Sequence, residues 1–213
     1  MRVSGVLLAA GASTRFGSPK MLAPVGEERI PLLRRVLDTW LGAGFDEVIV
    51  VLGCNAADIR VRFEENLLRR VYGDVATAPS VRFVENPNWE AGMFSSVKAG
   101  LAAANPDSTH FALSPADLPF LRESSLRTLL SAAASLDAGG LSLAVPTHAG
   151  RRGHPLLIPA ALRARLLSWP DSARLNQLFA EPDVTVHPLE DSDDSILHDV
   201  DRPADLLAKP GFP

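Results

Sequence analysis

Short apolar runs alternate with longer amphipathic stretches along most of this chain. The apolar runs have the length of strands and fall at Val3–Ala9, Glu47–Leu52, Val81–Val84, His110–Leu113, Leu141–Val145 and Leu156–Ile158. The stretches between them carry apolar residues at helical spacing and fall at Pro31–Leu41, Ala57–Val71, Phe94–Ala103, Ser124–Leu136 and Ala160–Leu167. This alternation is typical of consecutive β-α-β units. The sequence therefore predicts an α/β fold, a mostly parallel sheet covered by helices.

Composition narrows the class of protein further. The chain has 213 residues, 46% of them hydrophobic and 22% charged, which favours a compact fold over a disordered chain. We expect one domain over residues 1–213. The 21 basic and 25 acidic residues give a net charge of −4, the wrong sign for nonspecific binding of nucleic acid. No apolar run reaches the roughly 18 residues that a membrane span needs.

A single cysteine, Cys54, excludes a disulfide framework and multi-thiolate metal sites. A reducing cytoplasm is the natural compartment for such a chain, and we expect Cys54 to contribute only packing. The acidic stretch Leu189–Asp194 is predicted to be a solvated loop. Gly42 and Gly44 are candidates to end the helix that begins near Pro31.

The loop after the first strand is the most informative segment for function. Small residues run from Ala9 to Ser13, so backbone N–H groups there can approach a phosphate chain closely. Arg15 and Lys20 add positive charge. Because ligands of open parallel sheets collect at the carboxyl ends of the strands, this loop is predicted to bind a triphosphate.

Two common phosphate-binding motifs do not fit this loop. A Walker A motif starting at Gly11 would need glycine in place of Phe16. The dinucleotide-binding fingerprint would need glycine in place of Ser13. An ordinary P-loop enzyme or Rossmann dehydrogenase is therefore disfavoured.

Asp117 is the candidate metal ligand. It follows the strand predicted at His110–Leu113, so its carboxylate should lie beside the first loop, where a magnesium ion could bridge it to phosphate oxygens. A role as a helix cap or turn former is the alternative. Asp199 and Asp201 are candidates for a second ligand, and they lie on opposite faces if the segment is extended. Their alternative role is to cap a last helix at Pro203–Leu207.

Five motifs in order resemble those of the MobA-like nucleotidyltransferases, and specifically the molybdenum cofactor cytidylyltransferase branch. They are Leu8-Ala9-Ala10-Gly11-x-Ser13-x-Arg15-x-Gly17-x-x-Lys20, Asn86-Pro87-Asn88-Trp89-Glu90-Ala91-Gly92-Met93-Phe94-Ser95-Ser96, Asp117-Leu118-Pro119, Gly150-Arg151-Arg152-Gly153-His154-Pro155 and His198-Asp199-Val200-Asp201-Arg202-Pro203-Ala204-Asp205-Leu206. The chain departs from the family pattern at Phe16, at Arg202-Pro203-Ala204-Asp205 and at Pro170-Asp171-Ser172-Ala173. The resemblance implies a Rossmann-like, three-layer α/β/α nucleotidyltransferase fold.

The resemblance also implies an activity and a set of site residues. The enzyme would transfer CMP from CTP, or the nucleotide of another NTP, to the terminal phosphate of molybdopterin, with Mg²⁺ as cofactor and a molybdoenzyme or its chaperone as a further partner. The implied catalytic residues are Arg15, Lys20 and Asp117, and the implied nucleotide-binding residues are Leu8, Ala9, Ala10, Gly11, Ser13, Gly92, Met93 and Ser96. His154 and Arg152 would bind the acceptor, and Asp117, Asp199 and Asp201 are the candidate metal ligands.

Several alternatives stay open at this point. Ser95 or Ser96 could cap the helix that begins there, and a histidine in a Gly-His-Pro turn is as often structural as functional. The acceptor could be a sugar, polyol or other small phosphate, because the first loop and the carboxylate would serve any of them. The chain could also be a non-catalytic nucleotide-binding partner of a molybdoenzyme.

Overall fold

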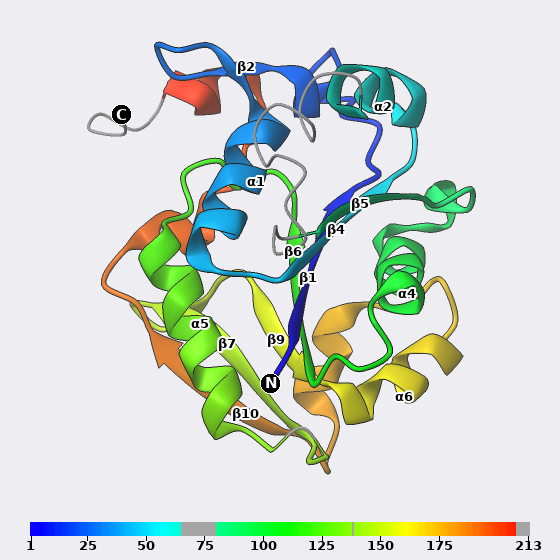
Figure 1. Ribbon diagram of the computed structural model, residues 1–213, viewed down its shortest axis with the longest axis vertical. Helices are drawn as coiled ribbons and strands as arrows, with labels where there is room; N and C mark the ends of the chain where they lie inside the picture. Colours follow the sequence, from blue (N-terminus) through cyan, green and yellow to red (C-terminus); the bar gives the residue numbers. More distant parts are fainter. Residues whose placement is uncertain (65–79, 138, 208–213) are drawn as a thin grey trace.

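The computed structural model describes residues 1–64, 80–137 and 139–207, and within them one eight-stranded sheet forms the centre of the molecule (Figure 1). The strands of this sheet are β1 (Val3–Ala9), β4 (Glu47–Leu52), β5 (Ser80–Glu85), β6 (His110–Pro115), β7 (Ser142–His148), β8 (Arg151–Arg152), β9 (Leu156–Pro159) and β10 (Thr185–Glu190). Their order is β10-β7-β9-β6-β1-β4-β5, and β8 pairs with β7. A separate two-stranded sheet joins β2 (Pro24–Val25) to β3 (Ile30–Pro31).

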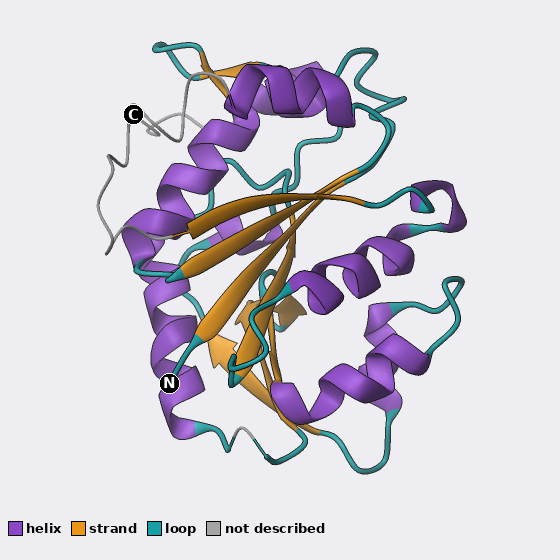
Figure 2. Cartoon of the chain, turned by 45° about the vertical axis from the view of Figure 1, so that its right-hand side comes forward, coloured by secondary structure: helices purple, strands orange, loops and turns teal. Residues whose placement is uncertain are grey.

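Helices cover both faces of the large sheet (Figure 2). One face carries α1 (Leu32–Ala43), α2 (Ala56–Glu64) and α5 (Glu123–Ser135), whose apolar residues share one core cluster. The other face carries α4 (Met93–Ala103) and α6 (Arg163–Ser168), which share a second cluster. The α/β expectation and the three-layer arrangement are thereby confirmed.

Helix α1 shows how the sequence builds one of these layers. It begins after Pro31 and ends at Gly44, whose φ of 103° is unfavourable for other residues. Its buried face includes Trp40, which packs against β1 at Gly5, where an added Cβ would come within 2.7 Å of the indole. A side chain at position 5 would therefore push α1 away from the sheet.

Apart from the unpredicted strands β2, β3, β8 and β10, the described helices and strands differ from the prediction in three places. Strand β9 pairs antiparallel with β6 and β7, so the chain is not built of β-α-β units throughout. The predicted loop at Leu189–Asp194 is wrong at its start, because Leu189 and Glu190 end β10, paired in parallel with β7. Helix α2 ends at Glu64, and the rest of the helix predicted to Val71 lies outside the described residues.

Cys54 also differs from its prediction, because it is exposed. It lies just after β4, where its backbone N–H donates to the Ala10 carbonyl at 3.1 Å and the loop leaves the sheet. Strands β1, β4 and β6 are parallel neighbours, so the loops that follow them share one edge of the sheet. No helix in the described part of the chain is long and apolar enough to cross a membrane.

Candidate active site

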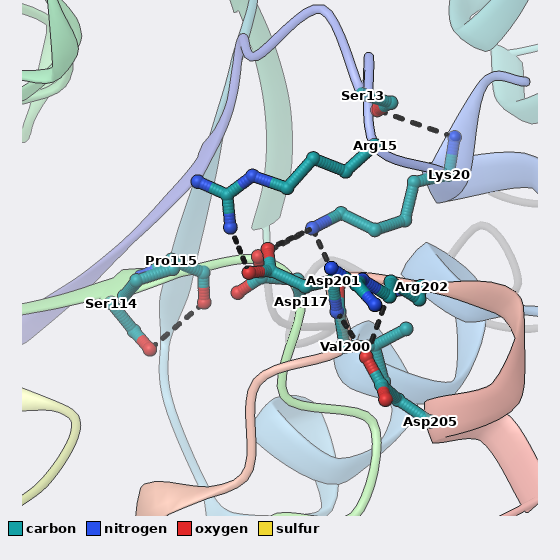
Figure 3. Close-up of polar contacts among 10 residues, drawn as sticks. All are labelled: Ser13, Arg15, Lys20, Ser114, Pro115, Asp117, Val200, Asp201, Arg202 and Asp205. Carbon is teal, nitrogen blue, oxygen red and sulfur yellow. Dashed lines mark hydrogen bonds and ion pairs between the residues drawn. The ribbon is translucent and has the colours of Figure 1, made fainter. Parts of the chain in front are cut away.

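The first loop turns tightly as it leaves β1. The N–H groups of Phe16 and Gly17 both donate to the Ser13 carbonyl, at 3.0 and 3.1 Å, and Ser13 has a positive φ of 54°. The loop ends in the short 3₁₀ helix η1 (Lys20–Leu22), where the Lys20 N–H donates to Ser13 Oγ at 3.4 Å. This turn places Arg15 and Lys20 on the same side of the loop (Figure 3).

A cavity of about 280 Å³, here called cavity 1, lies beneath this loop. Seven of the eight predicted nucleotide-binding residues line it: Leu8, Ala9, Ala10, Gly11, Ser13, Met93 and Ser96. Arg15, Lys20, Asp117 and Asp201 line it as well. The structure therefore brings the first loop, the start of α4 and the carboxylates after β6 and near the C-terminus to one place.

Charged groups in cavity 1 are paired with each other. Lys20 Nζ donates to Asp117 Oδ2 at 2.7 Å and to the Val200 carbonyl at 2.6 Å, and it lies 4.0 Å from Asp201 Oδ1 (Figure 3). Arg15 forms an ion pair with Asp201 from the other side. The cations predicted to hold phosphate are thus in contact with the carboxylates predicted to hold metal.

The geometry of Asp117 is not that of a helix cap. Helix α5 begins at Glu123 with Arg122 before it, so the Asp117 side chain does not cap it. One carboxylate oxygen, Oδ1, is buried and has no hydrogen-bond partner. A buried carboxylate oxygen without a partner is costly, and a hard cation would satisfy it.

Asp201 does not cap the last helix either. Its carboxylate pairs with Arg15, and Asp205, inside η6 (Pro203–Leu207), accepts the N–H groups of the preceding Asp201 and Arg202 at 2.9 and 2.7 Å. These bonds, that from Arg202 foremost, lower the pKa of Asp205. Asp205 therefore stays ionised and fixes the turn that carries Asp201.

A second cavity of about 570 Å³, here called cavity 2, adjoins the first. Leu8, Met93 and Pro115 line both cavities, so the two spaces share a wall. Gly92, His154 and Asp199 line cavity 2, which separates Asp199 from Asp201 as their spacing predicted. Much of the remaining lining is apolar, from Phe94 and Val97 on α4 and from Leu113 on β6, whereas the segment 171–176 contributes mainly polar residues.

His154 gives cavity 2 its most unusual polar group. The buried Nδ1 atom has no hydrogen-bond partner. Burial lowers the pKa of His154, against an opposing effect of the charges on Asp117 and Asp199, so the ring is neutral at pH 7. A neutral imidazole can accept a hydrogen bond from a ligand, which an imidazolium cannot.

The structure also places three residues named in the sequence analysis, Arg152, Ser95 and Ser96, and one that it did not single out, Asn86. Arg152 lines neither cavity, and its guanidinium stacks over the Phe179 ring at 4.2 Å. Ser95 and Ser96 are not helix caps, because both lie inside α4, whose N-cap is Gly92. Asn86 Nδ2 donates to both hydroxyls, at 2.8 and 3.0 Å, and anchors the start of α4. Only the Asn86-Pro87-Asn88 motif pointed to Asn86.

Sequence reasoning also missed Trp89 in cavity 1 and a contact to Asp171 in the lining of cavity 2. Lys98 on α4 donates to Asp171 Oδ1 at 2.8 Å and to the Trp169 carbonyl at 3.0 Å. The Trp169 and Phe94 rings stack with centroids 5.7 Å apart. These contacts attach the segment 169–171 to α4, and no sequence pattern linked residues 73 positions apart.

A family model described as the MobA-like NTP transferase domain matches residues 5–186. Among characterised proteins, the nicotine blue oxidoreductase of Paenarthrobacter nicotinovorans is 33% identical over 203 residues, 93% of this chain and 92% of the relative. The molybdenum cofactor cytidylyltransferase of Escherichia coli (strain K12) is 25% identical over 205 residues, 95% of this chain and 92% of the relative.

Solved structures agree with this match. The crystal structure of Rv0371c from Mycobacterium tuberculosis H37Rv superposes with a TM-score of 0.76 at 26% identity, covering 98% of each chain. A manganese complex of Rv0371c superposes with a TM-score of 0.66 at 24% identity, covering 90% of this chain and 89% of that one. The likeness therefore extends over the whole fold that carries both cavities.

Proposed function

Because the chain belongs to the family of MobA-like NTP transferase domains, we propose that it transfers CMP from CTP to the terminal phosphate of a molybdopterin-type acceptor. The observation that carries this proposal is the pair of adjoining cavities. Cavity 1 has two cations and two carboxylates, and cavity 2 has a largely apolar lining and room for a second substrate. The two cavities adjoin at Leu8, Met93 and Pro115, so substrates bound in them would meet there.

Cavity 1 fits the triphosphate. Arg15 and Lys20 would leave their carboxylate partners for the β- and γ-phosphates, and backbone N–H groups of the first loop would hold the same chain. The small side chains of Ala9 and Ala10 leave room beside it. Trp89, Met93 and Ser96 line the side of the cavity that would receive the nucleoside.

The donor set also fits a divalent cation, and Rv0371c, which shares this fold, was solved as a complex with manganese. Asp117, whose buried oxygen lacks a partner, and Asp201 would hold Mg²⁺ together with the phosphates. When bound, the ion would neutralise charge that develops on the triphosphate. Asp199, in cavity 2, is assigned to the acceptor side instead.

The transfer itself needs no strong base. The terminal phosphate of the acceptor has a second pKa near 6 and is largely dianionic at pH 7, so one of its oxygens can attack the α-phosphorus directly. The bond between the α-phosphorus and the bridging oxygen breaks, and pyrophosphate leaves. The residues of cavity 1 would position the two substrates and stabilise this charge.

Cavity 2 would hold the rest of the acceptor. A pterin ring is flat and carries N–H groups, which suit an apolar space with a neutral His154 and the Asp199 carboxylate at its wall. Arg152 lies outside this cavity, so of the two residues predicted for the acceptor we retain only His154. The departure at Pro170-Asp171-Ser172-Ala173 falls largely in its wall, where it would tune acceptor fit.

The test is a product assay with purified protein, molybdopterin, Mg²⁺ and CTP or GTP in turn. We expect the cytidine dinucleotide and pyrophosphate by mass spectrometry, and a kcat/KM for CTP about thirtyfold above that for GTP, equivalent to about 2 kcal/mol. A preference for GTP would overturn the cytidylyl assignment alone. Transfer to a sugar or polyol phosphate but not to molybdopterin would overturn the acceptor. Binding of CTP without any transfer would make the chain a non-catalytic nucleotide-binding protein.

One relative favours a second candidate function. The nicotine blue oxidoreductase is 33% identical over 93% of this chain, which makes reduction of nicotine blue in cavity 2 a specific alternative. The same protein should be incubated with nicotine blue and a reduced nicotinamide dinucleotide, and the absorbance of both followed. Under our proposal neither is consumed. Stoichiometric loss of both, with no nucleotidyl transfer, would replace the transferase assignment for this chain.

A further inference from the structure

The Lys20 ammonium is enclosed by oxygen atoms in cavity 1. It bonds to Asp117 Oδ2 and to the Val200 carbonyl, and Asp201 Oδ1 lies 4.0 Å away. The Lys20 side chain is only 11% exposed and that of Asp117 only 17%. Lys20 is therefore packed between the two carboxylates. A cation that only awaited phosphate would instead extend into solvent.

This position is the one that a divalent cation would need. Both an ammonium and Mg²⁺ seek anionic and carbonyl oxygens, and two positive ions cannot share the same small group of oxygens without strong repulsion. Lys20 bonds to only one of the two carboxylate oxygens of Asp117, because the buried Oδ1 has no hydrogen-bond partner. The ammonium thus neutralises the negative charge of the site but leaves one buried oxygen of Asp117 without a partner.

The protein alone offers few further ligands there. The described residues contain no group of three or more His, Cys, Asp or Glu side chains that could hold a metal ion. Mg²⁺ is commonly bound by one or two carboxylates together with substrate phosphates. A triphosphate would supply the missing oxygens and, at the same time, attract Lys20 and Arg15 away from Asp117 and Asp201.

We propose that Lys20 occupies the metal site of the nucleotide-free protein and excludes the divalent cation until a triphosphate draws the ammonium away. The metal and the nucleotide then bind together, never the metal first. Arg15 reinforces this order, because its ion pair with Asp201 occupies the second carboxylate. The inference rests on the proposed metal site at Asp117 but not on the identity of the acceptor.

The test measures binding of Mn²⁺ alone, without nucleotide or acceptor, by calorimetry and by the electron paramagnetic resonance of free Mn²⁺. Lys20→Met keeps an unbranched side chain of similar length and removes the charge. We expect it to bind Mn²⁺ at least tenfold more tightly than the wild type. Adding Asp117→Asn to this variant should cancel the gain, because the main ligand is lost.

Lys98→Met is the matched control. Lys98 also pairs with one carboxylate and one backbone carbonyl, but it lies outside cavity 1. Its removal changes the net charge of the protein equally and should leave the Mn²⁺ affinity unchanged. A gain in both lysine variants would show a general charge effect and overturn the proposal, as would equal affinities of wild type and Lys20→Met.

Folding is checked by circular dichroism, and Lys20→Gln serves as a second variant. If both substitutions at position 20 prevent folding, Lys20 is a structural ion-pair partner and the proposal is wrong. Because no product is measured, tight Mn²⁺ binding by Lys20→Met would support the exclusion by Lys20 even if the chain transferred a nucleotide to another acceptor. Failure of the acceptor assignment and failure of this inference are therefore distinguishable.

Discussion

Lys20 and Lys98 make nearly the same contacts in two different regions. Each bonds to one carboxylate and one backbone carbonyl, at 2.7 and 2.6 Å for Lys20 and at 2.8 and 3.0 Å for Lys98. Their surroundings differ. Asp117 keeps a buried oxygen without a partner and has a second carboxylate nearby, whereas Asp171 is 37% exposed and lies beside stacked aromatic rings.

This difference separates a ligand-binding site at Lys20 from a purely structural contact at Lys98, here called the Lys98 clasp, which joins α4 to the segment 169–171. In cavity 1 the lysine balances charge that would otherwise be buried and repulsive, so a ligand with its own charges can replace it. Beside cavity 2 the lysine joins α4 to the segment after α6, alongside the packing of Phe94 on Trp169. Contact distances alone would not distinguish the two lysines.

The largest expected effect is on turnover. Lys20→Ala should lower kcat about a hundredfold, as loss of one donor to transition-state charge typically does. The Tm should fall as well, because the partly buried Asp117 carboxylate loses its partner, but the protein should remain folded at the assay temperature. Initial rates with saturating CTP and acceptor, together with thermal unfolding, measure both quantities.

Lys98→Ala should retain most of the kcat and serves as the control for a lost lysine clasp. If instead Lys20→Ala kept full kcat and showed a large fall in Tm, the two lysines would be alike and both structural.

The next effect concerns the metal. Asp117→Asn keeps the size of the side chain and removes the charge that a hard cation requires. We expect the magnesium concentration for half-maximal rate to rise about tenfold, equivalent to about 1.4 kcal/mol. CTP binding should persist because Arg15, Lys20 and the first loop remain.

Asp171→Asn is the matched substitution in the Lys98 clasp and should leave the magnesium titration unchanged. Superimposable titrations of wild type and Asp117→Asn would place the metal elsewhere in the molecule.

The sequence predicted cavity 1 better than cavity 2 for a physical reason. The first loop and Asp117 follow neighbouring parallel strands, and the carboxyl ends of such strands meet at one edge of a sheet. The wall of cavity 2 depends on contacts that have no local pattern, such as Lys98 with Asp171, and on β9, whose direction periodicity does not reveal. Strand β10 was missed because its exposed edge position keeps it polar and includes Pro188.

A smaller effect is expected at the clasp beside cavity 2. Lys98→Met removes an ion pair that is partly exposed to solvent, so the free energy of unfolding should fall by only about 0.5 kcal/mol. Asp171, the last residue of the freed segment, lines cavity 2, so KM for the acceptor should rise severalfold while KM for CTP stays constant. Steady-state kinetics with each substrate varied in turn measure this split. A rise confined to the KM for CTP would show that Lys98 affects nucleotide binding in cavity 1 and would contradict this prediction.

The smallest expected effect tests the neutral histidine of cavity 2 through the pH dependence of stability. Burial lowers the pKa of His154 below its ordinary 6.5, so in mildly acidic solution the unfolded chain takes up a proton that the folded protein does not. The contribution of His154 to stability is therefore complete above pH 6.5 and is lost as pH falls below it. His154→Gln should make the free energy of unfolding fall less steeply between pH 7 and 5, measured by urea titration at each pH.

His110, at the other end of β6, also has a pKa lowered by burial, so the slope should decrease in His154→Gln without vanishing. The Asp117 charge raises the pKa of His154 from across the wall between the cavities. Asp117→Asn should therefore lower the pKa of His154 further and steepen the slope in the acidic range, but only when His154 is present. A slope that Asp117→Asn changes equally with and without His154 would show that the two cavities are electrostatically independent.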